Sequence, residues 1–334
     1  METLLVCPAC GSRTPDDGVA GGHRLDLRSL ERDGEVLACG CGRRYPIVDG
    51  VPIVLADPAA YLRDEATMVL ERDVEPEVAA LLVEGGPDSS PYARWLEVLS
   101  VYMDAHWGDR ATPPLDGAGD GAAALFARIE ARRTAPVARA VELGASVGRG
   151  VAALATGAQH VVGIDIKHGS LRRARRLLAG EPVRYARRIV GRRYAPATAS
   201  AGDLAVPADR VLLVCADALD PPLVPGWFDR VVALNVLDNV SHPRQLLSVI
   251  DGLCARGGEV ILSSPYAWQS GVTAEDERFG GDDPAAELVR ILRTGEGLSA
   301  PYTVEDEDEL TWTLRRERRC AVTYGVHYLR ARKP

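Results

Sequence analysis

The stretch from Val137 to Asp165 constrains the fold more than any other part of the sequence. It contains an apolar run that ends at Glu142, a glycine-bearing turn, a helix of small residues and a second apolar run that ends at Asp165. Apolar runs separated by such a helix are typical of buried parallel strands. Gly144 and Gly148 allow backbone angles that a Cβ would penalise, and they let the chain approach a ligand closely. The stretch therefore predicts a nucleotide pocket in which Asp165 accepts hydrogen bonds from ribose hydroxyls.

The spacing of this turn excludes two common nucleotide-binding motifs. Ser146 and Arg149 interrupt the GxGxxG pattern of dinucleotide enzymes, and the Lys-Ser/Thr pair of a phosphate loop does not follow Gly148. A glycine-rich turn that binds nothing is the alternative. The order acid, x, Gly, x, Ser, x, Gly, followed by an Asp at a strand end, resembles motifs I and II of class I S-adenosylmethionine methyltransferases. This resemblance implies a set of cofactor-binding residues: Glu142, Gly144, Ala145, Ser146, Gly148, Asp165 and Ile166.

Composition narrows the class of protein further. With 334 residues, 46% hydrophobic and 26% charged, the chain has the composition of a globular protein with one large and one small domain. Its net charge of −8 argues against non-specific nucleic-acid binding as the main function. We find no apolar run near the ~20 residues of a membrane span and no secretory signal, so we expect a cytoplasmic protein. Seven cysteines in that setting indicate a metal before disulfides.

Residues 1–57 are expected to form a zinc-ribbon domain. Two thiolate pairs on tight turns can close a tetrahedral zinc site, and they are Cys7, Cys10, Cys39 and Cys41. The second pair is one residue shorter than usual, so His23 could replace Cys39 or Cys41 as a ligand. A segment this short has little core, and a metal would supply the missing stability. The segments CPACG and LACGCGRRYPIVDGVPIVL resemble the zinc ribbons of tRNA-methyltransferase activator proteins, which implies a structural zinc without an open coordination position.

Residues 58–135 are expected to form a helical connector. Helices are predicted to break near Pro76 and to end at Gly85-Gly86, and Pro91 opens a helix with Trp95, Leu99 and Tyr102 at helical spacing. In many methyltransferases, which this chain resembles, a helix before the first strand covers the cofactor and touches the substrate.

Three residues near the end of that last helix are Tyr102, His106 and Trp107. His106 is the first candidate for a general base, because a neutral imidazole can take a proton from an ammonium or imidazolium group. In the alternative interpretation Tyr102 and Trp107 are packing residues and His106 caps the helix.

Residues 136–334 are expected to form the catalytic domain. RVLLVCADAL predicts a third strand that ends at Asp217, and the methyltransferase resemblance implies that Asp217 binds the adenine amino group with Ala216 and Ala218 beside the ring. WFDRVVALNVLDNV predicts a fourth strand that brings Asn235 and Asp238 to the carboxyl edge of the sheet, where Asn235 is also a candidate cofactor-binding residue.

The rest of this domain is expected to complete the sheet. The segment RYARRIVGRRYAPATASAG is expected to be irregular, and HPRQLLSVIDGLCARGG is expected to be a helix closed by Gly257-Gly258. EVILSSPYAW predicts a fifth strand, and two late β-like runs predict a final antiparallel pair. The expected fold is α/β, a Rossmann-like seven-stranded methyltransferase sheet with an N-terminal zinc ribbon and a helical connector.

A closer resemblance runs through this domain. GASVGRG, VVGID, the ADAL turn, FDRVVALNVLDNVSHPRQLL, GGEVILSSPYAW and Thr273–Gly281 are similar, in this order, to the methyltransferase domain of ovothiol-forming enzymes, which methylates an imidazole nitrogen. The iron-dependent sulfoxide synthase half of those enzymes is absent here, and a zinc ribbon stands in its place. The resemblance therefore implies N-methylation of a small nucleophile derived from an amino acid, but not ovothiol itself.

The expected reaction is transfer of a methyl group from S-adenosylmethionine to an amine or imidazole nitrogen of a small or peptide substrate, in natural-product tailoring. Tyr266 and Trp268 would shape the substrate pocket through aromatic contacts, and Asn235 and Asp238 would orient the nucleophile. Tyr324 and His327 are weaker candidates. The acidic run at residues 305–309 is expected to be a solvated loop or, alternatively, the rim of a site for a cationic amine.

Two other functions stay open. An RNA or translation-factor methyltransferase is favoured if the ribbon presents a basic face, for which the candidates are Arg13, Arg24, Arg43 and Arg44. A non-catalytic cofactor-binding scaffold is supported by Ser146, which replaces the second glycine of motif I. The sequence does not predict an oligomeric state.

Overall fold

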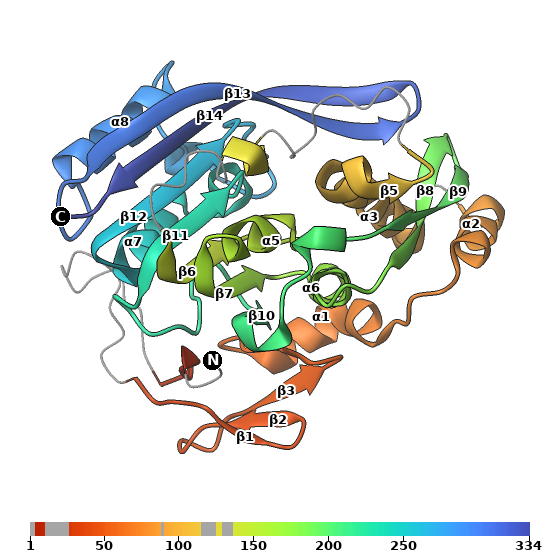
Figure 1. Ribbon diagram of the computed structural model, residues 1–334, viewed down its shortest axis with the longest axis horizontal. Helices are drawn as coiled ribbons and strands as arrows, with labels where there is room; N and C mark the ends of the chain where they lie inside the picture. Colours follow the sequence, from red (N-terminus) through yellow and green to blue (C-terminus); the bar gives the residue numbers. More distant parts are fainter. Residues whose placement is uncertain (1–3, 11–26, 88–89, 115–124, 129–135) are drawn as a thin grey trace.

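The computed structural model describes residues 4–10, 27–87, 90–114, 125–128 and 136–334 (Figure 1). A seven-stranded sheet lies at its centre, in the order β10-β7-β6-β11-β12-β14-β13. The strands are β6 (Val137–Leu143), β7 (Ala158–Asp165), β10 (Val211–Cys215), β11 (Phe228–Leu234), β12 (Cys254–Ser264), β13 (Thr303–Glu317) and β14 (Cys320–Arg332). The first five pair in parallel, and β14 is antiparallel to both β12 and β13. The predicted order of parallel strands followed by an antiparallel pair is confirmed.

Helices cover both faces of this sheet. On one face lie α5 (Arg149–Ala155) and α6 (His168–Leu178), whose buried side chains join one hydrophobic core. On the other face lie α7 (Pro243–Leu253) and α8 (Pro284–Thr294), whose leucines and isoleucines join a second core. Apolar side chains on both faces explain why the inner strands are continuous hydrophobic runs. The predicted α/β, Rossmann-like class is confirmed.

Two of the three connector helices pack on a second, smaller sheet. These two are α2 (Pro76–Gly85) and α3 (Pro91–Trp107), whereas α1 (Pro58–Leu70) lies against α6. The smaller sheet has the order β5-β9-β8. Its strands are β5 (Ala111–Thr112), β8 (Val183–Val190) and β9 (Arg193–Ala199). Asp104 of α3 and Arg187 of β8 form a buried ion pair of 2.9 Å, which fixes the hairpin against the helix. The prediction that RYARRIVGRRYAPATASAG is irregular is therefore wrong, because this segment forms β8 and β9. Its apolar side chains are buried by the connector helices rather than by the central sheet.

Two predicted boundaries also differ from the structure. Helix α7 ends at Leu253, so that Gly257 and Gly258 lie within β12 rather than at a helix end. Gly258 accepts a hydrogen bond from the Lys333 backbone N–H, and a Cβ at Gly258 would lie 2.8 Å from the Ala255 carbonyl oxygen. The glycine pair thus allows close backbone packing at a register shift between β11 and β12. Strand β10 ends at Cys215, which leaves Asp217 in the turn that follows.

The acidic run at residues 305–309 lies in β13, so the solvated loop predicted for it is wrong. Two of its carboxylates pair with arginines: Arg128 lies 2.7 Å from Asp308, and Arg332 lies 2.6 Å from Glu305. A third, Glu307, lies 3.2 Å from Nε2 of His327. The hairpin of β13 and β14 then continues past the central sheet and reaches β8 (Figure 1).

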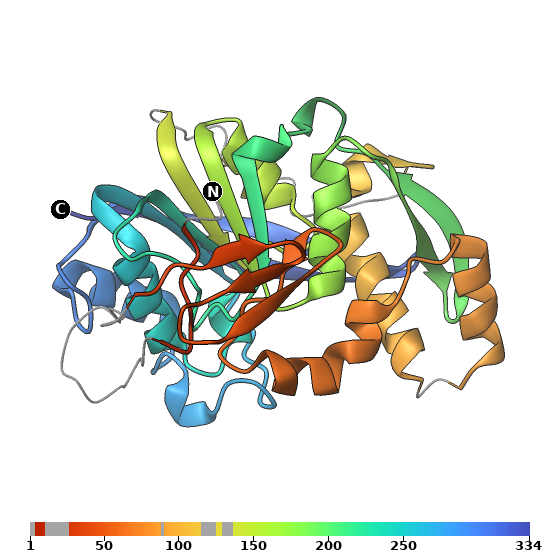
Figure 2. The ribbon, with the colours of Figure 1, turned by 90° about the horizontal axis from the view of Figure 1, so that it is seen from below.

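The described part of residues 1–57 forms a small antiparallel sheet beside β10 (Figures 1 and 2). Its strands are β1 (Glu31–Asp33), β2 (Val36–Ala38), β3 (Arg44–Val48) and β4 (Val51–Pro52). Ile53 forms a parallel bridge with Cys215, and the Val54 N–H donates a 2.9 Å hydrogen bond to the Cys215 carbonyl. We call residues 4–10 and 27–57 the cysteine module. Its chain is thus hydrogen-bonded directly to the edge of the central sheet.

Short 3₁₀ helices complete the described chain: Gly108–Arg110, Gly202–Leu204, Ala208–Arg210, Leu237–Asn239 and Glu275–Glu277. Among the residues with described structure, we find no helix whose length and apolar character would let it cross a bilayer.

Candidate active site

The strand order of the central sheet reverses between β6 and β11, and the turns after these two strands meet. A Cβ at Gly144 would lie 2.5 Å from Cγ2 of Val236, so the turn after β6 tolerates only glycine there. Gly148 has φ +85°, and a Cβ on it would lie 2.8 Å from Cβ of Ala174 in α6. Ligands of open α/β sheets bind at such a reversal, outside the carboxyl ends of the strands.

Asp165, the last residue of β7, links the turn after β6 to the turn after β7. Its carboxylate accepts 2.8 Å hydrogen bonds from the backbone N–H groups of Ser146 and Lys167. Burial raises the pKa of Asp165, and these two hydrogen bonds oppose the shift. The carboxylate is therefore held rigidly beside the glycine turn.

Backbone strain gathers at the same edge of the sheet. Ser146, Asn235 and Tyr266 have φ of 47°, 55° and 51°, and each follows a parallel strand. Two hydrogen bonds to Ser263 fix Asn235. Its backbone N–H donates to the Ser263 carbonyl, and the Ser263 hydroxyl donates to its side-chain oxygen at 2.9 Å. Strained residues of this kind persist where the surrounding structure fixes them, and they cluster at ligand-binding sites.

Glu142 is a buried carboxyl group behind the glycine turn. Burial, reinforced by the nearby Asp165, raises the pKa of Glu142 to about 8. Its Oε2 has no hydrogen-bond partner among the described residues. A Cβ on Gly150 would lie 1.9 Å from its Oε1, so the start of α5 lies directly against this carboxyl. An unpartnered buried oxygen fits a site that is completed by a ligand.

These residues line one cavity of about 1090 Å³. Nine of the predicted cofactor residues are among its walls: Glu142, Gly144, Ser146, Asp165, Ile166, Ala216, Asp217, Ala218 and Asn235. The other two, Ala145 and Gly148, lie behind the walls and are buried. Cavities that bind small ligands span about 300–1,000 Å³, so this one has room for a cofactor and part of a substrate.

Helix α3 forms the opposite wall and brings Tyr102 and His106 to the cavity. His106 is buried, its ring lies 5.4 Å from that of Phe126, and its Nδ1 has no partner among the described residues. Burial, followed by the charge of Arg149, lowers the pKa of His106 to about 3. This imidazole is therefore neutral at physiological pH. Its low basicity disfavours the predicted general base, and its lack of charge disfavours a charged helix cap.

Trp107 has a structural role, as the alternative interpretation of that helix end expected. It is fully buried, and its Nε1–H donates a 2.8 Å hydrogen bond to the carbonyl of Val147 in the glycine turn. The guanidinium of Arg149 lies 5.1 Å from its ring centroid. The end of α3 and the glycine turn are thus fixed to each other.

Three of the predicted catalytic residues do not line this cavity. Asp238 is buried, and its carboxylate accepts bonds from the Ser264 hydroxyl at 3.2 Å and the Ala267 N–H at 3.1 Å. Burial raises the pKa of Asp238, and these bonds oppose the shift. Tyr266 and Trp268 pack against Phe279, with ring centroids 6.5 and 5.9 Å away. The placement predicted for these three residues is corrected: they hold together the loop after β12.

The weaker candidates lie on β14. His327 is buried and bridges the Tyr266 hydroxyl, at 2.9 Å, and Glu307. Tyr324 is half-buried, with its ring 6.1 Å from that of Trp312.

The sequence did not identify the rest of the cavity wall. Many of these residues come from α1, α3, α6, the segment at residues 125–128 and β13. They include Tyr61, Trp95, Val98, Phe126 and Trp312. The Tyr61 hydroxyl donates a 2.8 Å hydrogen bond to the Ile166 carbonyl, which joins α1 to the turn after β7. The helical spacing of Trp95 and Tyr102 was visible in the sequence, but it also fits simple packing.

The cysteine module brings four sulfur atoms within 4.8 Å of one another. Cys7 and Cys41 lie 3.8 Å apart, and Cys10 and Cys39 lie 3.6 Å apart. A zinc ion with Zn–S bonds of about 2.3 Å and tetrahedral angles separates its sulfur ligands by about 3.8 Å, so the cluster fits that ion. His23, Arg13 and Arg24 lie outside the described residues, while Arg43 and Arg44 are exposed.

Comparison with known proteins supports the methyltransferase class that the α/β fold indicates. Residues 141–262 match the family model described as a methyltransferase domain. A demethylmenaquinone methyltransferase from Clavibacter sepedonicus is 31% identical over 176 residues, which are 52% of this chain and 53% of that protein. The chain therefore spans about half the length of this curated relative.

Two solved structures show similar chains at low identity. The N-methyltransferase NodS from Bradyrhizobium japonicum WM9, in complex with S-adenosyl-L-homocysteine, is 14% identical, with a TM-score of 0.42 over 72% of this chain and 99% of that one. A chain of the complex between the Haloferax volcanii Trm112 methyltransferase activator and a methyltransferase is 14% identical, with a TM-score of 0.45 over 74% and 100%.

The fold and the family match together define the class of protein. The chain carries a class I S-adenosylmethionine-dependent methyltransferase domain, with residues 141–262 at its centre. It is an enzyme domain of the transferase type.

Proposed function

We propose that the chain is an N-methyltransferase that acts on an amine or imidazole nitrogen of a small amino-acid-derived or peptide substrate, in natural-product tailoring. One observation carries this proposal: the cavity brings together the nine predicted cofactor residues and His106, whose imidazole is held neutral by burial. The cofactor would lie along the carboxyl edge of β6, β7, β10 and β11. The substrate would lie between the cofactor and helix α3.

The walls of the cavity suit a nitrogen base. Asp64, Glu65, Asp165 and Asp217 place carboxylates along it, which attract a cationic amine. Trp95 and Trp312 add aromatic faces, which stabilise a methylammonium product by cation–π attraction. The resemblance to ovothiol-forming enzymes in the sequence points to the same type of nucleophile.

The reaction needs a neutral nitrogen and an aligned lone pair. When bound, S-adenosylmethionine supplies a methyl group on a sulfonium. The neutral imidazole of His106 would accept a hydrogen bond from the substrate N–H and so turn the lone pair of that nitrogen toward the methyl group. The buried apolar side chains of Leu99 and Phe126 in the cavity wall would disfavour the charged form of the nitrogen. The proton released after transfer goes to water, because an imidazole with a pKa of about 3 does not retain it.

The test combines binding and turnover. We expect calorimetric titration with S-adenosylhomocysteine to show micromolar binding that Asp165→Ala abolishes. Transfer of labelled methyl groups is then measured on histidine, histamine, aromatic amines and short peptides. His106→Phe keeps a ring of similar size without the acceptor, and we expect it to lower kcat by about tenfold or more while cofactor affinity stays unchanged. His160→Phe, at an exposed position, is the matched control. Well-folded protein that binds no S-adenosylhomocysteine would instead favour the scaffold.

A second candidate is methylation of a quinone-like substrate. The relative with 31% identity is a demethylmenaquinone methyltransferase, and part of the cavity wall is apolar, including Met68, Val69 and Val272. Methyl transfer to a reduced quinone in the same assay, without transfer to any amine, would select this function. Transfer to RNA alone would select the nucleic-acid alternative.

We also propose that Cys7, Cys10, Cys39 and Cys41 bind a structural zinc ion. The support is the sulfur spacing, which fits tetrahedral coordination, and the two tight turns that carry the pairs. The Tyr45 hydroxyl lies 3.0 Å from Cys7 Sγ, and its hydrogen bond would hold this sulfur in position to bind the metal. Metal analysis of the purified protein tests it, with one zinc per chain expected.

A further inference from the structure

Two hairpin tips that are far apart in the sequence meet at one end of the molecule. The Arg318 backbone N–H donates a 2.9 Å hydrogen bond to the Ile189 carbonyl, and the Gly191 N–H donates one of 2.9 Å to Glu317. The turn between β8 and β9 therefore lies against the turn between β13 and β14 (Figure 1). We call residues 188–194 and 315–319 the tip surface.

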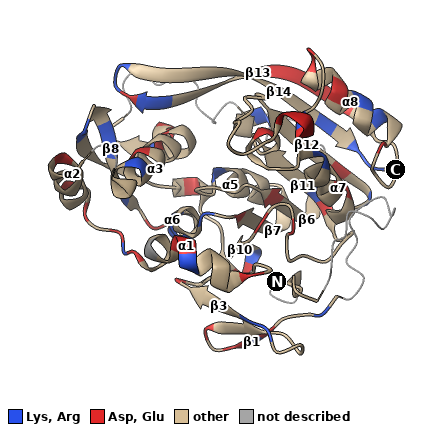
Figure 3. Ribbon diagram, turned by 180° about the vertical axis from the view of Figure 1, so that it is seen from behind, with Lys and Arg blue, Asp and Glu red and all other residues tan. Residues whose placement is uncertain are grey.

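The tip surface is strongly basic on a chain whose net charge is −8. It carries seven arginines: Arg188, Arg192, Arg193, Arg315, Arg316, Arg318 and Arg319. The acidic groups beside them are Glu84, Glu97 and Glu317, and Glu97 already pairs with Arg188 at 2.5 Å and Arg316 at 3.0 Å. Figure 3 shows arginines at the tip of the β13–β14 hairpin, whereas at its opposite end the acidic stretch of β13 lies beside basic residues of β14.

Three of these arginines are exposed and free of partners within the described residues: Arg193, Arg318 and Arg319. Free guanidinium groups on a rim gain from an anionic partner without first breaking an ion pair. The surface is therefore suited to bind carboxylates or phosphates.

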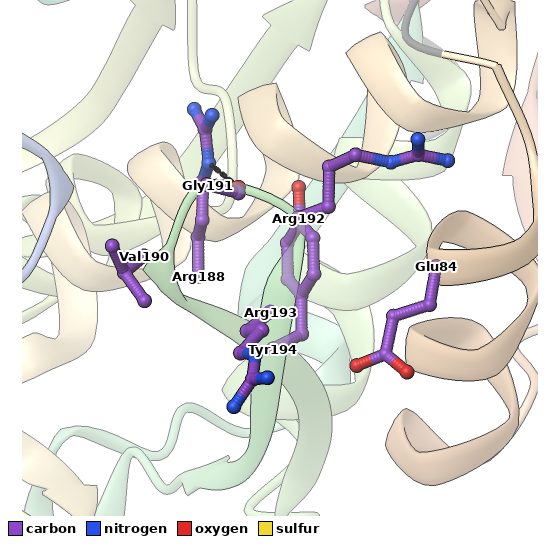
Figure 4. Close-up of a pocket in the computed structure, with 7 residues that line it drawn as sticks. All are labelled: Glu84, Arg188, Val190, Gly191, Arg192, Arg193 and Tyr194. Carbon is purple, nitrogen blue, oxygen red and sulfur yellow. Dashed lines mark hydrogen bonds between the residues drawn. The ribbon is translucent and has the colours of Figure 1, made fainter.

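A groove of about 1020 Å³ runs along the β8–β9 turn (Figure 4). Arg192 and Arg193 leave the turn in different directions on either side of Tyr194, and Glu84 of α2 faces them. Val190, which also lines the groove, is 46% exposed. Guanidinium groups that diverge in this way suit several spaced anionic groups better than one small ion.

Helix α2 adds apolar side chains next to this groove. It packs on β8 and β9 through Ala79, Ala80 and Val83, while Leu81 and Leu82 are 68% and 56% exposed. Leu81 lies one helical turn from Glu84, on the side of α2 that meets the groove. The basic surface is thus continuous with an apolar one.

We propose that the tip surface docks an acidic, amphipathic segment of the peptide that carries the methylated nitrogen. This inference rests on the proposed peptide substrate. Helix α3 lies between the docking surface and the cavity: Glu97 pairs with Arg188 of the tip, and Val98, the next residue, lines the cavity and is 54% exposed. A helix is about 10 Å wide, so about three residues of extended chain connect the two sites.

The composition of the surface favours a peptide over a nucleic acid. Exposed Val190, Leu81 and Leu82 match the apolar side chains of an amphipathic segment. Among the described residues of the tip surface, the aromatic ring is that of Tyr194, which is half-buried, whereas binding of single-stranded nucleic acid relies on several exposed rings on which successive bases stack. Acidic strands and helices elsewhere, including β13, would repel a long polyanion that extends beyond the tips.

The test uses a short fluorescein-labelled peptide of Glu-Glu-Leu-Ala repeats, followed by fluorescence anisotropy. We expect the full chain to bind it, more weakly as salt rises, and to ignore the Gln-Gln-Leu-Ala counterpart. Arg318→Ser/Arg319→Ser should weaken binding about tenfold. Arg256→Ser/Arg293→Ser removes two exposed arginines from other elements and should leave binding unchanged.

Three results would overturn the proposal: no binding of the acidic peptide, equal weakening in both double variants, or tighter binding of an oligouridylate of the same length. The last would assign the surface to nucleic acid. The peptide assay needs no cofactor, and S-adenosylhomocysteine titration of every variant runs beside it. Failure of docking with intact cofactor binding therefore counts against this proposal alone, whereas wild-type protein that binds no cofactor counts against the methyltransferase.

Discussion

The indole nitrogen of Trp107 donates a 2.8 Å hydrogen bond to the carbonyl oxygen of Val147, and this bond ties the end of helix α3 to the glycine turn. One helix therefore contributes both a wall of the cavity and a support for the proposed cofactor site.

Replacing this indole tests the support. Trp107→Phe keeps an aromatic ring but removes the donor, and loss of a buried hydrogen bond of about 1 kcal/mol should weaken S-adenosylhomocysteine binding about fivefold. Calorimetric titration measures the change. Trp227→Phe is the control, because the Trp227 Nε1 has no partner among the described residues and its ring lies over Arg139, away from the cavity. Equal effects of both variants would contradict this role.

The contact between Gly150 and Glu142 gives a second prediction. Gly150→Ala would force the Glu142 carboxyl out of place, because a Cβ lies 1.9 Å from its Oε1. We expect a loss of thermal stability of about 1–3 kcal/mol and strongly reduced cofactor binding. Gly85→Ala, in open space at the end of α2, should change neither. Unaltered cofactor binding in Gly150→Ala would mean that Glu142 does not contribute to the site.

The raised pKa of Glu142 predicts how stability depends on pH. The folded chain keeps this proton up to a pKa of about 8, whereas the unfolded chain loses it near the ordinary value of 4.5. The unfolded state thus binds fewer protons in that interval, and the contribution of Glu142 to stability falls as pH rises from about 4.5 to about 8. Glu142→Gln should flatten this dependence and raise the melting midpoint at pH 8 by a few degrees. Parallel melting curves of the two proteins across the interval would refute the assignment.

Removing the metal tests the cysteine module. The Val48 carbonyl of this module lies 3.1 Å from His168 Nε2, at the start of α6 and next to the Asp165 turn. Cys39→Ser should abolish zinc binding, lower the melting midpoint and weaken S-adenosylhomocysteine binding, because the module supports that turn. Cys320→Ser, at an exposed cysteine outside the cluster, is the control. If zinc-free protein binds S-adenosylhomocysteine with unchanged affinity, the metal stabilises the cysteine module alone and does not support the cofactor site.

The sequence predicted the parts of the molecule whose signals are local. The run from Val137 to Asp165 needs only buried strands, a glycine turn and a short helix, and these are adjacent in the chain. The β8–β9 hairpin was missed because its strands are rich in arginine, and the apolar residues among them are buried by α2 and α3 rather than by the central sheet.

The candidate site was predictable only on its cofactor side. Gly144, Asp165 and Asn235 follow strands that the sequence identifies, whereas Phe126 and Trp312 reach the same cavity from segments that are distant in sequence. Tyr266 was misplaced because its strand ends at the expected edge, but its side chain turns toward His327 and Phe279. Spacing along one strand does not determine which side of the following loop faces the cavity.

The bridge between Ile53 and Cys215 also bears on how the chain avoids pairing with its own copies. An uncovered edge strand is a template for aggregation, and proteins blunt such edges with charge or cover them. At one edge of the central sheet, β13 carries five consecutive carboxylates, at residues 305–309; at the other, the cysteine module covers the carboxyl end of β10. Detachment of the module would therefore uncover both this sheet edge and part of the core that the module shares with the central strands, and we expect such a chain to self-associate.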